Sequence, residues 1–222
     1  MTTQGVSSRW WKSFGISLII ALTFSIYLFA RRGYYNIYIV NKVLGSTAAV
    51  VAGLTLIVGP LIHRWPRMSR LMEIRRELGL WALIYSLVHV ITSTILQSKR
   101  FSWSWYLSEW IPISFGVVAI ATWIYMTAIS NGGAIAKLGA DVWKRKLRIG
   151  GFVAYIAIFL HLTTMKYQGW INWWRGLVKA SPELANPQYP PASIFVFLTI
   201  LAILLFRLFE AVLSRSRTNP AK

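Results

Sequence analysis

The chain of 222 residues has no cysteine and only six acidic residues, against 24 lysines and arginines. Without cysteine it forms no disulfide, holds no iron–sulfur cluster through its own side chains and attaches no haem through thioether bonds. The formal net charge of +18 would suit a nucleic-acid-binding protein, but here the basic residues flank long apolar runs. That pattern indicates anionic lipid headgroups as partners and gives no support for nucleic acid.

Long polar stretches are also scarce. Hydrophobic residues make up 56% of the chain and gather in runs of about 18 to 22 residues, the length that crosses a ~30 Å hydrocarbon layer. The sequence therefore predicts an all-α polytopic membrane protein, a six-transmembrane-helix bundle that forms a single domain over residues 1–222. The predicted spans are Ser13–Ala30, Val43–Ile62, Leu78–Leu96, Ile111–Ser130, Ile149–Met165 and Ala192–Leu213.

Basic residues are divided unequally between the two sides of these spans. Sixteen of the 24 lie on the side of the N-terminus and eight on the other. Because positively charged loops stay in the cytoplasm, we predict a multi-pass protein of the cytoplasmic (inner) membrane with both termini cytoplasmic. The first span ends at Arg31 and Arg32 without a small-residue cleavage site, so it is expected to be retained rather than removed as a signal peptide.

Trp and Tyr are concentrated in the two longer outer loops, where such rings anchor helices at headgroup depth. In the second of these loops, Gly169–Lys179 is predicted to form a short amphipathic helix lying flat on the outer surface.

Two of the three histidines fall inside predicted spans, where an ionisable ring is costly and usually functional. His89 follows Arg76 by 13 residues, and His161 follows Arg148 by 13, so both rings lie ~20 Å from their basic flank, at matching depth. Each belongs to a stripe of small residues that recurs every three or four positions on one helix face. The stripes are Gly79, Ala82, Ser86, His89 and Ser93, and Gly150, Ala154, Ala157, His161 and Thr164.

Such a pair suits a flat macrocycle between two helices, with an imidazole nitrogen reaching the iron from either face. The residues predicted to bind this cofactor are His89 and His161, as iron ligands, and Ser86, Ser93, Ala157, Thr164 and Lys166. An alternative stays open, because small stripes also allow close helix packing and histidines can hydrogen-bond between helices. A zinc or copper site has less support, since neither span places a carboxylate or thiolate beside the rings.

Charged residues outside the two stripes have predicted roles as well. The haem propionates are expected on the outer side, near Lys166, Lys99 and Arg100. His63 is expected at the headgroups, and Arg207 in the last span is expected to snorkel or to pair with Glu210.

Three runs carry a family resemblance: LTLIVGPLIHRWP, RRELGLWALIYSLVHV and LGADVWKRKLRIGGFVAYIAIFLHL. They resemble the ferric-reductase-like transmembrane family, and within it the short bacterial branch of haem-binding subunits of periplasmic methionine sulfoxide reductase systems (the MsrQ or YedZ type). The resemblance covers the second to fifth spans and, more weakly, the sixth. It implies a cytochrome b that passes electrons from a cytoplasmic flavin donor or a quinol to an outer acceptor. His89 and His161 match the family's haem-ligating histidines.

The chain departs from the family at one position of the fifth span. Members of the family usually have a second histidine there, whereas this chain has Arg148. The two-haem relatives also have a histidine near the start of the third span, where this chain has Arg75 and Arg76. Arginine stays protonated and cannot ligate iron, so one haem b is expected and the inner haem is not. Arg76 and Arg148 suggest instead a site for an anionic headgroup or a flavin phosphate.

The sequence also bears on partners. It contains no glycine-rich dinucleotide fingerprint, so electrons must come from a quinone, a flavin or another subunit rather than from a nicotinamide bound by this chain. Expected partners are membrane lipids, a redox protein on the outer side, and a cytoplasmic flavin reductase or a larger membrane complex. Two functions remain open: the electron-transfer subunit of an oxidoreductase, or a structural or assembly subunit that binds haem or another macrocycle without turnover. A transporter has less support, because no discontinuous helix pair is evident.

Overall fold

The computed structural model describes residues 3–218, and the side chains of residues 7–213. Its long helices are α1 (Thr3–Arg32), α2 (Ile37–Arg64), α3 (Leu71–Ile91), α5 (Trp110–Ala128), α7 (Ala140–Trp174) and α8 (Ala192–Thr218). Shorter elements connect them: the 3₁₀ turn η1 (Pro66–Met68), the π-helical turn η2 (Thr92–Leu96), α4 (Trp103–Ser108) and α6 (Gly132–Leu138). Three basic residues counted on the N-terminal side, Arg215, Arg217 and Lys222, lie outside the described side chains.

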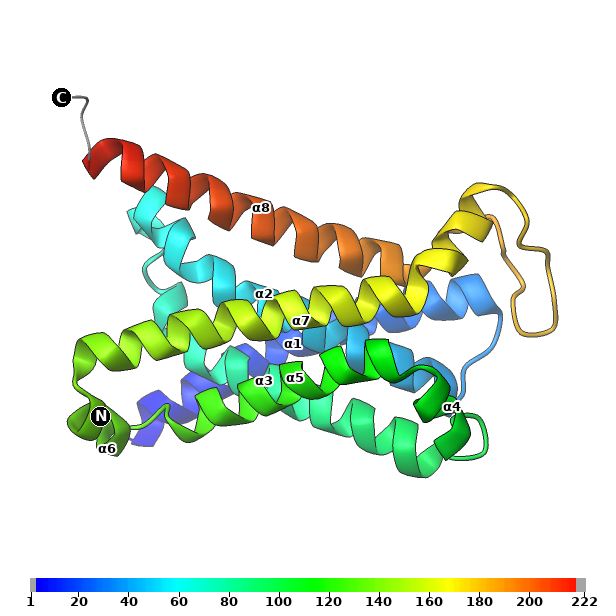
Figure 1. The fold of residues 1–222 in the computed structure, drawn as a ribbon, viewed down its shortest axis with the longest axis horizontal. Coiled ribbons are helices and arrows are strands. Elements are labelled where there is room, and N and C mark those ends of the chain that lie inside the picture. The colour runs from blue at the N-terminus through cyan, green and yellow to red at the C-terminus, as the bar shows by residue number, and fades with distance from the viewer. Residues whose placement is uncertain (1–2, 219–222) are drawn as a thin grey trace.

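Six helical segments of the described chain are long and apolar enough to cross a membrane, which confirms the predicted all-α fold and its number of spans. They are Ser7–Arg32, Ile37–Arg64, Leu71–Leu96, Trp110–Ala128, Ala140–Trp174 and Ala192–Leu213. Figure 1 shows them side by side, with α1 beginning and α8 ending at the same end of the bundle, which we call the terminal end. The loop between α7 and α8 and the short helix α4 lie at the opposite end, the far end.

α7 differs most from the prediction. The predicted span Ile149–Met165 is the middle of one helix of 35 residues. The prediction of a separate flat helix at Gly169–Lys179 was wrong, because α7 continues through this segment to Trp174 without an internal proline or cap. The chain turns only at Gly176, whose φ of 67° lies in the left-handed region that commonly ends a helix.

α2 is the centre of the bundle and contacts α1, α3, α7 and α8. It is the most buried span, and small residues bring its neighbours close. Gly53, for example, faces the Tyr155 hydroxyl of α7 and Ile203 of α8. Two antiparallel helix pairs result: α3 packs along α2, and α7 packs along α5. In the described chain α3 and α7, which carry the two predicted iron ligands, do not pack along each other.

A proline inside α2 explains the position of Arg207. Pro60 has no N–H to donate, so the carbonyl of Leu56, four residues earlier, lacks its helical partner. The Arg207 guanidinium fills this role, donating to the Leu56 oxygen at 2.7 Å. The predicted pair of Arg207 with Glu210 is therefore not formed among the described side chains, and Glu210 lies 3.9 Å from Arg64 instead. His63 is exposed at the end of α2, as expected for a headgroup residue.

Candidate functional site

The imidazole of His89, on α3, is held by the backbone of α2. Its Nδ1 lies 3.0 Å from the carbonyl oxygen of Asn41. Because a carbonyl oxygen only accepts, we assign the proton to Nδ1, which leaves the Nε2 lone pair available. The ring lies against Gly45, one turn after Asn41, where a Cβ atom would be 3.1 Å from the ring carbon Cε1. The absence of a side chain at Gly45 allows the ring to reach the α2 backbone.

The imidazole of His161, on α7, is held by α5 in the same way. Its Nδ1 lies 2.6 Å from the carbonyl oxygen of Pro112. The ring lies against Gly116, also one turn after the acceptor, where a Cβ would be 3.2 Å from Nδ1. We therefore assign a proton to Nδ1 of His161 as well, which leaves its Nε2 as the nitrogen available to a ligand.

The two arrangements match closely. Each histidine stands on the second helix of a pair, and its acceptor lies on the first, 48 residues earlier for His89 and 49 for His161. Neither Nε2 has a hydrogen-bond partner among the described residues. Both side chains are only partly buried. The structure thus holds two imidazoles in the same way, each on a different helix pair.

The other residues of the predicted stripes have structural partners. Ser86 Oγ donates to the Ala82 oxygen at 2.8 Å, and Ser93 Oγ to the His89 oxygen at 2.9 Å. Thr164 Oγ1 donates to the Leu160 oxygen at 2.6 Å. Ala157 is buried at 4% exposure. The three hydroxyls are therefore engaged within their own helices, and contact of these residues with a cofactor stays a prediction.

The glycines of the stripes lie at helix contacts. A Cβ at Gly79 would be 3.9 Å from Thr55 of α2, and one at Gly150 would be 2.9 Å from Met126 of α5. Close helix packing, the alternative that the sequence left open, accounts for this part of both stripes. It does not account for the free nitrogen on each imidazole.

Sequence reasoning missed the residues that position the histidines. The acceptors, Asn41 and Pro112, act through backbone oxygens, which every residue type has. Gly45 and Gly116 did leave a signal, because each is a glycine in an apolar span, four residues after an acceptor. The glycine that precedes each intramembrane histidine, by 44 residues for His89 and 45 for His161, was the available clue.

Positive charge gathers at the far end of the bundle. Tyr38 of α2 carries Arg100 over its ring at 3.9 Å and Lys42 at 4.2 Å. Lys166 follows His161 by five residues on α7, ~7.5 Å along the helix. Lys42 also lies at this end although the sequence did not single it out, and contact of Lys166 with a cofactor stays a prediction. Of the other residues proposed for the propionates, Arg100 is also 3.4 Å from Glu183, and Lys99 is exposed.

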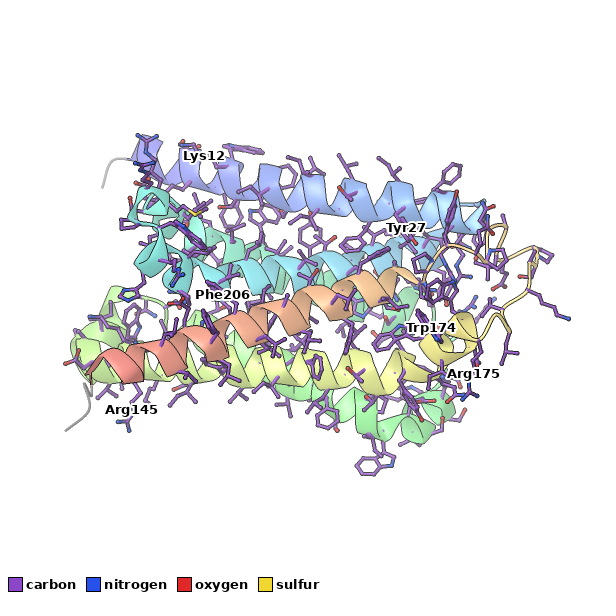
Figure 2. All side chains as sticks on the ribbon, turned by 90° about the horizontal axis from the view of Figure 1, so that it is seen from above. Lys12, Tyr27, Arg145, Trp174, Arg175 and Phe206 are labelled. Carbon is purple, nitrogen blue, oxygen red and sulfur yellow. The ribbon has the colours of Figure 1, made fainter. Side chains whose placement is uncertain are left out.

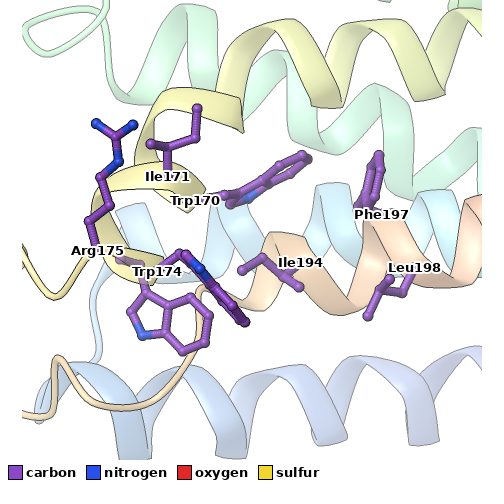
Figure 3. A pocket seen from close by; sticks show the side chains of 8 residues that line it. Trp170, Ile171, Trp174, Arg175, Ile194, Phe197 and Leu198 are labelled. Carbon is purple, nitrogen blue, oxygen red and sulfur yellow. The ribbon is translucent and has the colours of Figure 1, made fainter.

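A separate pocket of about 500 Å³ lies at the far end between α7 and α8. Figure 3 shows the rings of Trp170 and Phe197 lining it, with Arg175 at its rim. None of the predicted site residues lines this pocket, so it is distinct from the histidine pair.

The donors present fit a haem better than a metal ion bound by protein alone. No third His, Asp or Glu side chain of the described chain joins the two histidines. A structural zinc ion normally takes four protein ligands, whereas the iron of a haem needs only axial ligands from the protein. Two neutral imidazoles, each with an available nitrogen, meet that need.

Known proteins with a similar sequence are named for haem binding. No family model matches the chain. The chain is similar to MsrQ. Proteins named protein-methionine-sulfoxide reductase heme-binding subunit MsrQ, from Salmonella paratyphi B, Salmonella newport and Salmonella heidelberg, are each 26% identical over 153 residues. The similarity covers 59% of this chain and 76% of each relative. It is a distant homology over part of the chain, and it agrees with the resemblance to the MsrQ-type branch.

Proposed function

We propose that this chain is a membrane b-type cytochrome, a haem-binding subunit that transfers electrons through one haem held by His89 and His161. The observation that carries the proposal is the matched pair of imidazoles, each bonded through Nδ1 to a backbone carbonyl and each with Nε2 free. A hydrogen bond to the second nitrogen fixes the orientation of a ligating histidine and raises its basicity. The name of the MsrQ relatives supports haem as the cofactor class.

In this proposal His89 and His161 would hold the haem iron, and the haem would supply reversible one-electron chemistry. Asn41 and Pro112 hold the rings through their carbonyl oxygens, so that ligation costs little reorganisation. Both histidines stand on helices that are packed against other helices, which gives the ligands a rigid support.

The environment of the pair suggests which groups meet the rest of the cofactor. Lys166 follows His161 by five residues on α7, and the amine of Lys42 lies over the Tyr38 ring, so both lysines lie on the far side of the rings, where the acidic propionates are expected. Ser86, Ser93, Ala157 and Thr164 are small enough to lie beside a macrocycle. We propose one haem per chain, because Arg148 occupies the position at which the family that this chain resembles has a further histidine, and arginine does not ligate iron.

The proposed donor is a quinol or a cytoplasmic flavin, and the proposed acceptor is a redox protein on the outer side. The relatives are named as one subunit of a reductase, which supports a role as the electron-transfer subunit of an oxidoreductase rather than a complete enzyme. The proposed location is the cytoplasmic membrane, with both termini in the cytoplasm.

Optical spectra of the purified protein test the proposal. Reduced-minus-oxidised difference spectra and haem per chain are measured for the wild type, His89→Ala and His161→Ala. His63→Ala is the matched control, since His63 is the remaining histidine and is exposed at the terminal end. We expect one low-spin haem in the wild type and in His63→Ala, and its loss or conversion to high spin in the other two variants.

Two results would contradict the proposal. No haem in the wild type, or unchanged haem in His89→Ala and His161→Ala, would reduce the two histidines to packing residues. A bound macrocycle that cannot be reduced would favour the alternative, a structural or assembly subunit without turnover.

A further inference from the structure

Two arginines meet beside the proline of α2. Arg75 of α3 donates from Nε to the carbonyl oxygen of Thr55 at 2.7 Å. Arg207 of α8 donates to the carbonyl oxygen of Leu56, the next residue, also at 2.7 Å. Because the two acceptors are consecutive residues on one helix, the two guanidinium groups lie close together at the terminal half of the bundle.

A third arginine comes from α7. The guanidinium carbon of Arg207 lies 4.2 Å from the centre of the Phe152 ring, and Phe152 is one turn beyond Arg148. Because residues four apart share one face of a helix, Arg148 lies on the face of α7 that Arg207 contacts. We call these three residues, Arg75, Arg148 and Arg207, the arginine cluster.

No carboxylate balances the arginine cluster. All six acidic residues lie in the described part of the chain, and three of them pair with other arginines: Glu77 with Arg9, Glu210 with Arg64 and Glu183 with Arg100. The other three, Glu73, Glu109 and Asp141, form no ion pair there. Arg75 and Arg207 are half-buried, where like charges repel each other more strongly than in open water, and the side chain of Arg148 is exposed. The cluster therefore has an unmet need for an anion.

We propose that the arginine cluster binds a phosphate group, carried by an anionic lipid headgroup or free in solution. A planar guanidinium has five N–H donors, and its fork matches two phosphate oxygens. The described hydrogen bonds of Arg75 and Arg207 to α2 use one donor atom each, which leaves further donors for a ligand. Arg75 takes the place that the sequence suggested for Arg76, because Arg75 bonds to α2 beside Arg207.

This site is independent of the proposed haem site. Arg148 precedes His161 by 13 residues on one helix, which separates the two by ~20 Å. The phosphate site can therefore fail its test while the haem proposal stands, and the reverse also holds.

Arg148→Gln is the most informative variant. The side chain of Arg148 makes no hydrogen bond to other described residues, so its removal takes away charge without exposing a backbone carbonyl. Arg145→Gln is the matched control, because Arg145 is exposed on the same helix and extends from the bundle in Figure 2. Arg148→Lys is a second variant that keeps the charge but lacks the forked donor geometry.

The full chain is purified in detergent and stripped of lipid, and its thermal unfolding midpoint is followed during titration. The probes are phosphatidylglycerol in mixed micelles, phosphatidylcholine at the same mole fraction, and inorganic phosphate. We expect wild type and Arg145→Gln to be stabilised at about tenfold lower probe concentration than Arg148→Gln, with Arg148→Lys between them.

The probes separate the two sources of phosphate. Stabilisation by phosphatidylglycerol alone identifies a lipid headgroup, and stabilisation by inorganic phosphate identifies a free phosphate ligand. Equal responses of Arg148→Gln and Arg145→Gln, or no response of the wild type to either anionic probe, would overturn the proposal.

Discussion

At the scale of single residues, one missing methyl group beside each imidazole controls the proposed haem site. Gly45 and Gly116 each occupy the position one turn after a carbonyl acceptor, and a side chain there would meet the ring within about van der Waals distance. Neither glycine is required by backbone conformation, since both lie within regular helices. Their role is to make room for a histidine from the next helix.

Gly45→Ala and Gly116→Ala should each disturb the low-spin spectrum of the proposed haem. A Cβ at 45 would lie 3.1 Å from His89, so the ring must shift away from Asn41. We expect partial conversion to high spin and a loss of stability of about 1–3 kcal/mol from overpacking. Optical spectra and thermal unfolding measure the two effects. Gly59→Ala on the same helix is the control, because it has open space beside it and should leave the spectrum unchanged.

The sequence identified the histidines but not what holds them. A histidine in an apolar span can be recognised from the sequence alone. His89 and His161 follow Arg76 and Arg148 by the same number of residues, which indicated that both rings lie at the same depth. The groups that orient the rings are backbone oxygens, which carry no residue-type signal. The partner of Arg207 could not be predicted from the sequence either. The nearest acidic residue along the chain, Glu210, does not pair with Arg207 in the structure.

At the scale of elements, α2 combines a helix-breaking residue with a central position in the bundle. Pro60 leaves the Leu56 carbonyl without a helical donor, and Arg207 of α8 replaces it from outside. This polar contact joins α2 to α8, as the Arg64–Glu210 ion pair does nearer the terminal end.

Replacing Arg207 by methionine should therefore destabilise the bundle, and replacing Pro60 by alanine should reduce the damage. Arg207→Met leaves a partly buried carbonyl unpaired, a cost of about 1–3 kcal/mol. Pro60→Ala restores an N–H that can bond to the same carbonyl within α2. We expect Arg207→Met to lower the unfolding midpoint more in the wild type than in the Pro60→Ala background. Equal losses in both backgrounds would show that the Leu56 contact contributes nothing.

Hydropathy predicted the number of spans but underestimated the length of several helices, most of all that of α7. The apolar run of α7 ends near Met165, where charged and polar residues begin, but its helix continues to Trp174. Side-chain polarity marks where the membrane ends, whereas a helix ends where its backbone hydrogen bonds stop. The last span begins where it was predicted, at Ala192, and its helix likewise continues beyond the predicted end at Leu213, to Thr218.

At the scale of the whole molecule, the ends of the chain share one side with most of the positive charge. In Figure 2, Lys12 and Arg145 lie at the end of the bundle opposite to Trp174 and Arg175. An even number of spans puts both termini on one side, and the excess of lysine and arginine predicts that this side is the cytoplasm.

Reporter fusions measure this orientation directly. A fluorescent protein fused to the C-terminus should fold and fluoresce, because it stays in the cytoplasm, while a periplasm-dependent phosphatase at the same position should be inactive. The same phosphatase inserted in the loop between α7 and α8 serves as the control and should be active. The reverse pattern would contradict the predicted orientation.

The length of α7 has a consequence for the membrane in which the protein works. A helix of 35 residues is ~52 Å long, well beyond a ~30 Å hydrocarbon layer. In a thinner bilayer α7 can keep its apolar middle covered by tilting, but it is tied to α5 through the ring of His161. The two helices must then tilt together, so bilayer thickness acts on the spacing between the two histidine-bearing helix pairs.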